Sequence, residues 1–258
     1  FLPPGVGIVV LVLGFSLVSV LALFGLGVSA FVVVQFMLPA LLVGESGVLV
    51  GLVGSAAIMM VVLPTTHGFS LRTGAALAGT LAGVLLTAVL AVLSVQATRL
   101  SGISDEGGGI LLANVEGLSF QGLLSCAILI AGLGVLNDVT ITQASAVWEI
   151  RGAAPELSRR RVFASGMLIG RDPIASTIYT IVFAYAGTAL TLLLVLQLYD
   201  RSTVDLLNTE ELAGEVVRTL ATSIGLVLAV PLTTAIAVLT LPRGVSRETA
   251  GAPGLMSD

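Results

Sequence analysis

The sequence contains very few charged residues. Charged side chains make up 10% of its 258 residues, whereas hydrophobic ones make up 56%. A soluble domain carries about 25% charged residues, so these side chains are too few to cover a surface that faces water. The mean hydropathy of +1.10 agrees with this shortage. The composition therefore excludes one large soluble domain and indicates a protein whose surface mostly faces lipid.

Cysteine, histidine and lysine are also scarce. The single Cys126 excludes an intramolecular disulfide and a cysteine metal site, and the single His67 excludes a histidine metal cluster. All 11 basic residues are arginines, and the net charge of −4 indicates no nucleic-acid-binding surface. The ATP-binding pattern GxxxxGK[ST] does not occur, nor does a hydrolase, kinase or redox motif. We therefore predict no metal, no cofactor and no enzymatic activity.

Long apolar stretches dominate what remains. A transmembrane helix needs about 20 mostly apolar residues. We predict an all-α transmembrane bundle over 1–241, with a tight turn at Gly25-Leu26-Gly27 between the first two spans. A mobile cytoplasmic tail is predicted at 242–258. The seven predicted spans lie near 6–25, 28–43, 47–66, 74–98, 120–148, 170–198 and 212–241.

The connections between the spans predict the orientation. The 148–163 connection is rich in arginine, whereas the 99–119 connection is acidic. Because cytoplasmic loops of membrane proteins carry an excess of basic residues, the first of these is predicted to be cytoplasmic. Counting seven spans outward from it places the N-terminus outside the cytoplasm and the C-terminus inside.

The fifth predicted span is unusually polar in its second half. An aspartate within a bilayer costs about 2.5–3.5 kcal/mol on insertion scales, so Asp138 is predicted to face a partner or a water-filled cavity. Gly132 and Gly134 allow a neighbouring backbone to approach or the helix to unwind. An alternative is that these polar groups only join helices through hydrogen bonds. The candidate residues here are Asn137, Asp138, Thr140, Thr142 and Gln143.

A second polar group opens the sixth predicted span. Asp172 followed by Pro173 is typical of a helix start, and the free N–H groups there favour an anion beside Arg171. The alternative is that Arg171 pairs with Asp138 or Asp172 and binds nothing. Because Asp138 and Arg171 come from adjacent predicted spans and are costly to leave in lipid, both are predicted to point into the bundle and to lie close together. We expect discontinuous or kinked helices near 132–138, 170–173 and 231. The candidate residues are Gly170, Arg171, Asp172, Ser176, Thr177 and Thr180, with a secondary polar group of Glu215, Arg218 and Thr222 in the last span.

These polar segments resemble a known family. The stretch GLGVLNDVTITQASAVWEI, the arginine-rich loop and then SGMLIGRDPIASTIYTIVFAYAG are similar to the YibE/F-like family of bacterial membrane proteins. The resemblance implies the bacterial inner membrane and a transporter of unspecified substrate. It also implies an extracytoplasmic N-terminal domain that this chain, which begins at Phe1, does not include.

Together these patterns predict a transporter or channel-like permease for a small solute. An inorganic oxyanion such as phosphate is the first candidate, because Arg171 offers a planar fork of donors. Proton coupling through Asp138 would reconcile this with the nearby negative charges. A cation or metal transporter is an alternative, as is a non-transporting scaffold that anchors an extracytoplasmic domain. The predicted partners are the lipid bilayer and a small molecule or ion, and a homo-oligomer is left open.

Overall fold

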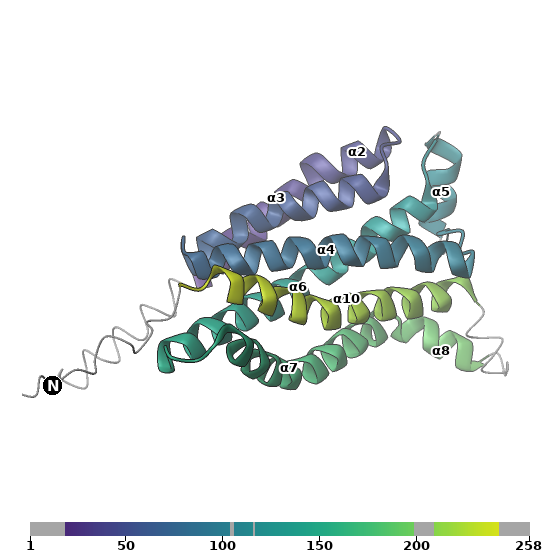
Figure 1. The fold of residues 1–258 in the computed structure, drawn as a ribbon. Coiled ribbons are helices and arrows are strands. Elements are labelled where there is room, and N and C mark those ends of the chain that lie inside the picture. The colour runs from purple at the N-terminus through teal and green to yellow at the C-terminus, as the bar shows by residue number, and fades with distance from the viewer. Residues whose placement is uncertain (1–18, 104–105, 116, 199–208, 243–258) are drawn as a thin grey trace, which may run out of the picture.

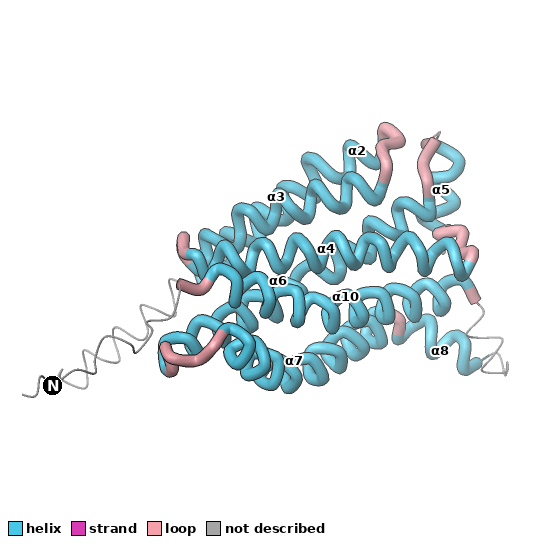
Figure 2. Tube along the Cα trace, in the orientation of Figure 1, coloured by secondary structure: helices cyan, strands magenta, loops and turns pink. Residues whose placement is uncertain are grey.

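A computed structural model describes residues 19–103, 106–115, 117–198 and 209–242, and all regular secondary structure in these ranges is helical (Figures 1 and 2). The first helix runs from Ser19 to Leu42 and includes the π-helical segment η1 (Val33–Met37) and α2 (Leu38–Leu42). The other helices are α3 (Gly47–His67), α4 (Leu71–Thr98), α5 (Glu106–Asn114), α6 (Phe120–Ala153), α7 (Arg159–Thr188), α8 (Leu190–Leu198) and α10 (Glu210–Thr240).

The predicted all-α bundle is confirmed. Within the described ranges, five helices are long and apolar enough to cross a membrane, namely Ser19–Leu42, α3, α4, α6 and α10. Their outward faces carry large exposed apolar side chains such as Leu23, Leu49 and Leu85. The helix α7 is 30 residues long but is not among the five; with α8 it runs beside α10 (Figure 1). The predicted tail from residue 243 onward lies outside the described residues.

Three of the long helices begin at a serine that satisfies a free backbone N–H group. The side chain of Ser70 accepts a hydrogen bond from the Thr73 N–H at the start of α4, at 3.1 Å. Ser119 and Ser158 cap α6 and α7 in the same way. Such caps contribute about 1 kcal/mol each, and they fix where each helix begins after its loop.

The helix α6 lies at the centre of the bundle and contacts α3, α4, α7 and α10. On another side, α4 and α10 approach each other closely because glycines face threonines: Gly79 lies against Thr233, and Gly225 lies against Thr87. Small residues of this kind allow helix backbones to approach in a membrane, where no hydrophobic effect drives them together. The core of the protein is therefore the junction of α4, α6 and α10.

The predicted turn at Gly25-Leu26-Gly27 is wrong, because the chain is helical through these three residues. Gly25 instead packs against Val62 of α3. The irregularity in this helix is the π-helical segment that precedes Pro39. Proline lacks an N–H donor, and a local change of hydrogen-bond pattern accommodates that loss. Most of the first predicted span, 6–25, lies outside the described residues.

The prediction that the helix is discontinuous at 170–173 is also wrong, although α7 is visibly curved (Figure 1). The helix α7 runs without interruption from Arg159 to Thr188 and holds Pro173 in its interior. The helices α6 and α10 likewise remain helical through 132–138 and Pro231, so no helix is discontinuous at the three predicted places. Such prolines are tolerated in transmembrane helices because neighbouring helices and side-chain hydroxyls form hydrogen bonds with the backbone groups that proline leaves free. Consequently no free helix N-terminus lies beside Arg171.

The loops group at the two ends of the bundle as predicted. Arg72, Arg151 and Arg159–Arg161 lie at one end, here called the arginine end, where Arg159 also donates a hydrogen bond to the Leu241 carbonyl at 3.0 Å. The helix Ser19–Leu42 is antiparallel to α3, since its Gly25 contacts Val62 and its Met37 contacts Gly54. Its beginning therefore also lies at the arginine end, whereas α5 lies at the opposite end (Figure 1).

The orientation of these ends in the membrane remains a prediction with a direct test. We expect the arginine end to be cytoplasmic, because basic loops are retained there. In a Cys126→Ala background, an impermeant thiol reagent applied to intact cells should label Glu45→Cys, at the opposite end, and spare Glu156→Cys. Labelling of Glu156→Cys before the cells are lysed would contradict the orientation.

Candidate functional site

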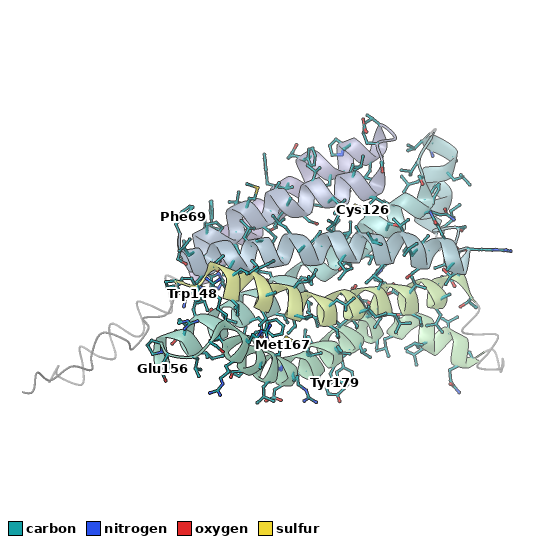
Figure 3. All side chains as sticks on the ribbon, in the orientation of Figure 1. Phe69, Cys126, Trp148, Glu156, Met167 and Tyr179 are labelled. Atoms are coloured by element: carbon teal, nitrogen blue, oxygen red, sulfur yellow. The ribbon has the colours of Figure 1, made fainter. Side chains whose placement is uncertain are left out.

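Most of the charged candidates face away from the bundle. Asp138 of α6 is exposed, as are Arg171 and Asp172 of α7. Tyr179, on the same outer side of α7, points away from the other helices (Figure 3). The remaining exposed candidates are Thr142, Ser176 and Thr180, and the last two donate hydrogen bonds to carbonyls of their own helix. Asn137 and Thr177 are half-buried.

The expected contact between Asp138 and Arg171 is not made within the chain. Among the described residues the one ion pair joins Arg218 to Glu215, and neither Asp138 nor Arg171 points into the bundle. The prediction that this pair lies inside a single bundle is therefore wrong. Leaving the charges of Asp138 and Arg171 in contact with lipid nevertheless remains costly.

Three candidates lie at the centre of the bundle. Gln143 of α6 is buried and donates hydrogen bonds from Nε2 to the Gly166 carbonyl of α7 at 2.8 Å and to Thr234 Oγ1 of α10 at 2.7 Å. Gly170 packs directly against this amide and Val230. Thr140 shares a 2.5 Å hydrogen bond with Thr80 of α4. These contacts tie α4, α7 and α10 to α6.

Seven buried polar side chains lie at this junction, and we call them the polar seam. Each is at least 98% buried and comes from α4, α6 or α10, the helices that share the core. Thr80 and Thr87 are seven residues apart on α4, and Thr222 and Thr233 are eleven apart on α10, which keeps each pair on the inner face of its helix. The seam consists of Thr80, Thr87, Thr140, Gln143, Thr222, Thr233 and Thr234.

Two hydroxyls of the seam, those of Thr222 and Thr233, have no hydrogen-bond partner. Thr233 is completely buried, and its Oγ1 is unpartnered, whereas the neighbouring Thr234 Oγ1 donates to the Val230 carbonyl at 2.7 Å and accepts from Gln143. A buried polar atom without a partner costs about 1–3 kcal/mol. Folded proteins contain few such atoms, so each one requires an explanation.

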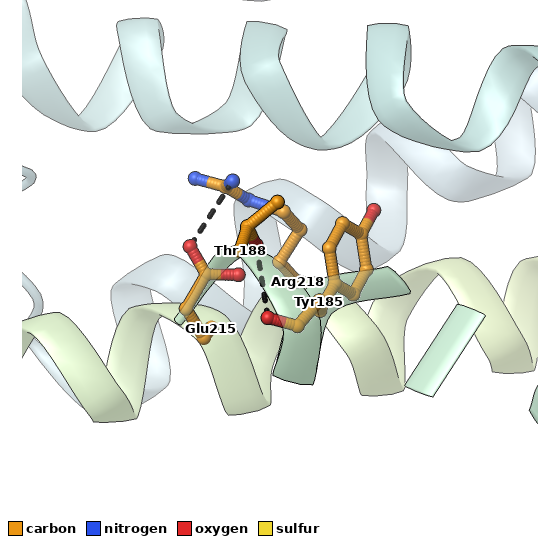
Figure 4. Close-up of polar contacts among 4 residues, drawn as sticks. All are labelled: Tyr185, Thr188, Glu215 and Arg218. Atoms are coloured by element: carbon orange, nitrogen blue, oxygen red, sulfur yellow. Dashed lines mark hydrogen bonds and ion pairs between the residues drawn. The ribbon is translucent and has the colours of Figure 1, made fainter. Parts of the chain in front are cut away.

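A charged cluster lies at the other end of the seam, about one turn of α10 from Thr222. Arg218 Nη1 is 3.2 Å from Glu215 Oε1, and the Arg218 guanidinium carbon lies 5.9 Å from the centre of the Tyr185 ring (Figure 4). The second carboxylate oxygen of Glu215 and the Nε of Arg218 are buried and unpartnered. The ion pair therefore has unused hydrogen-bonding capacity on both partners.

Cavities adjoin this cluster on two sides. One, of about 20 Å³, is lined by Glu210, Glu215 and Arg218 and has room for about one water molecule. The other, of about 260 Å³, lies between α7, α8 and α10, and its wall is apolar except near Glu215. Neither cavity is lined by a residue of the seam. The core between the charged cluster and Gln143 is closed by tight packing such as that of Gly225 on Thr87.

Sequence reasoning missed Tyr185 and the threonines of α4. The threonines had a usable signal, since Thr73, Thr80 and Thr87 recur every seven residues and all three are buried. No sequence pattern indicated Tyr185, because the contact of its ring with Arg218 depends on how α7 packs on α10. Within the described residues, no group of histidine, cysteine, aspartate and glutamate could hold a metal ion.

The comparisons with known proteins identify one family. The family model described as YibE/F-like protein matches residues 5–243, which is nearly the whole chain. Among curated proteins and solved structures, none matches the chain.

Proposed function

Because this chain belongs to the YibE/F-like family and is a membrane protein, we propose that it transports a small solute along the polar seam. The solute would enter at Glu215 and Arg218 and leave near Gln143 and Thr234, at the other end of the seam. In the packed arrangement of the structure this path is closed, so transport requires α10 to move relative to α4 and α6. Such rearrangements of helices are how transporters expose a site to each side in turn.

The unpartnered polar atoms support this proposal most directly. Glu215, Arg218 and Thr233 each keep a buried atom with no hydrogen-bond partner. Lipid-exposed helices avoid such groups, and a purely structural core would gain stability by replacing them. A passing solute can use them, because it brings the missing donors or acceptors.

An inorganic oxyanion such as phosphate is our first candidate for the solute. Arg218 presents a guanidinium whose Nε is free, and threonine hydroxyls of the seam can donate to oxygen atoms. Asp138 does not line the proposed path, because its side chain faces outward. Proton coupling through Asp138 is therefore not part of this proposal. We propose no catalytic activity.

Flux into liposomes that contain the purified protein tests the proposal. Uptake of phosphate and sulfate should be compared with that of protons and divalent metal ions. Arg218→Lys should lower oxyanion uptake about tenfold, the effect of losing ~1.4 kcal/mol, because lysine lacks the bidentate fork. Arg160→Lys, at an exposed position of the arginine end, is the matched control and should keep the parental flux.

The outcomes separate the alternatives. Flux of a cation but of no oxyanion would overturn the solute assignment and keep the transporter. Flux of none of the solutes would favour a scaffold, for which the tight packing at Gly79 and Gly225 is the supporting observation.

A further inference from the structure

Asp138 lies near the middle of α6 yet faces outward. It is 18 residues from Phe120 and 15 residues from Ala153, which is ~27 Å and ~22 Å along the helix. A hydrocarbon core of about 30 Å centred on this long helix therefore includes Asp138. Its side chain is exposed and forms no ion pair with any described residue. A carboxylate at this depth is costly to leave against lipid.

Arg171 lies at a similar depth on the neighbouring helix. The preceding residue, Gly170, packs on Gln143, which is five residues or ~7.5 Å along α6 from Asp138. Arg171 lies one residue nearer to the level of Asp138, so the two Cα atoms differ in level by ~6 Å, a distance that a long, flexible arginine side chain can cover. Arg171 is exposed and forms no ion pair with any described residue. One bundle therefore presents opposite charges outward, at nearly the same level, from adjacent helices.

We infer that two copies of this chain pack together through these faces, so that Asp138 of each meets Arg171 of the partner subunit. A two-fold axis along the membrane normal keeps every residue at its own depth, and the pairing therefore requires the matching levels described above. The outer face of α6 suits a close approach, because Gly134 lies one turn from Asp138 and has no atom within 4 Å of where a side chain would begin. The inference does not depend on transport.

Charge removal and reversal test the interface. The parent protein, in liposomes at low density, should be dimeric when its subunits are counted by single-molecule photobleaching. Asp138→Asn and Arg171→Gln should each raise the monomer fraction at least tenfold. Asp138→Arg and Arg171→Asp should do the same alone, whereas the double variant Asp138→Arg/Arg171→Asp should restore the dimer. Glu156→Gln, which removes an exposed charge at the arginine end, should leave the dimer unchanged.

Each contrary result is decisive. A monomeric parent overturns the inference, as does a dimer that persists in Asp138→Asn and Arg171→Gln. If the reversal variants fail to fold, the two charge-removal variants still decide the matter, with thermal unfolding as the check on folding. A double reversal that folds but stays monomeric shows that the two residues do not pair.

Discussion

Gly170→Val should strongly destabilise the protein. A side chain at residue 170 would run into Gln143 Oε1 and Val230. Both belong to rigid helices, and Gln143 is held by its bonds to the Gly166 carbonyl and Thr234. The valine must therefore push α7 away from the bundle. Overpacking of this kind costs about 3 kcal/mol.

Gly187→Val is the matched control for this experiment. It lies in the same helix but has no atom within 4 Å of a new side chain, so the free energy of unfolding should barely change. Thermal unfolding of both variants in detergent, followed by a thiol-reactive dye at the buried Cys126, measures the difference. Equal midpoints for the two variants would mean that α7 is not held at Gly170.

Gly170 also shows why the sequence misled about α7. The local pattern Gly-Arg-Asp-Pro is typical of a helix start, and each of its residues has the right preference for one. The glycine is instead needed for contact with α6, and Pro173 is tolerated inside a helix that packs on its neighbours. The packing of α7 on α6 therefore outweighed the local preference of Gly-Arg-Asp-Pro for a helix start. This packing could not be predicted from the residues adjacent in sequence.

The helices themselves were largely predictable. The expected spans at 47–66, 74–98, 120–148 and 212–241 correspond to α3, α4, α6 and α10, because long apolar runs have few structural alternatives. The candidate site was harder. Helical periodicity shows which residues share a face, but not whether that face turns inward. Asp138 and Thr142 share a face that turns out, whereas Gln143, one residue further, turns in.

The adjacent pair Thr233 and Thr234 separates stability from function most cleanly. Both are completely buried in α10, but only Thr234 has hydrogen-bond partners. Thr233→Val removes an unsatisfied hydroxyl and keeps the shape, so the free energy of unfolding should rise by about 1 kcal/mol. Thr234→Val should lower it by a similar amount, since Gln143 loses one of its acceptors.

Flux measured on the same two preparations then tests the seam. If the Thr233 hydroxyl serves a passing solute, Thr233→Val should reduce uptake by about tenfold, the equivalent of one lost hydrogen bond worth ~1.4 kcal/mol. A more stable protein that transports less cannot be explained by damage to the fold. Parental flux in Thr233→Val, together with the expected gain in stability, would instead remove this hydroxyl from the path. In that case the buried Thr233 oxygen would lower stability without any benefit in transport.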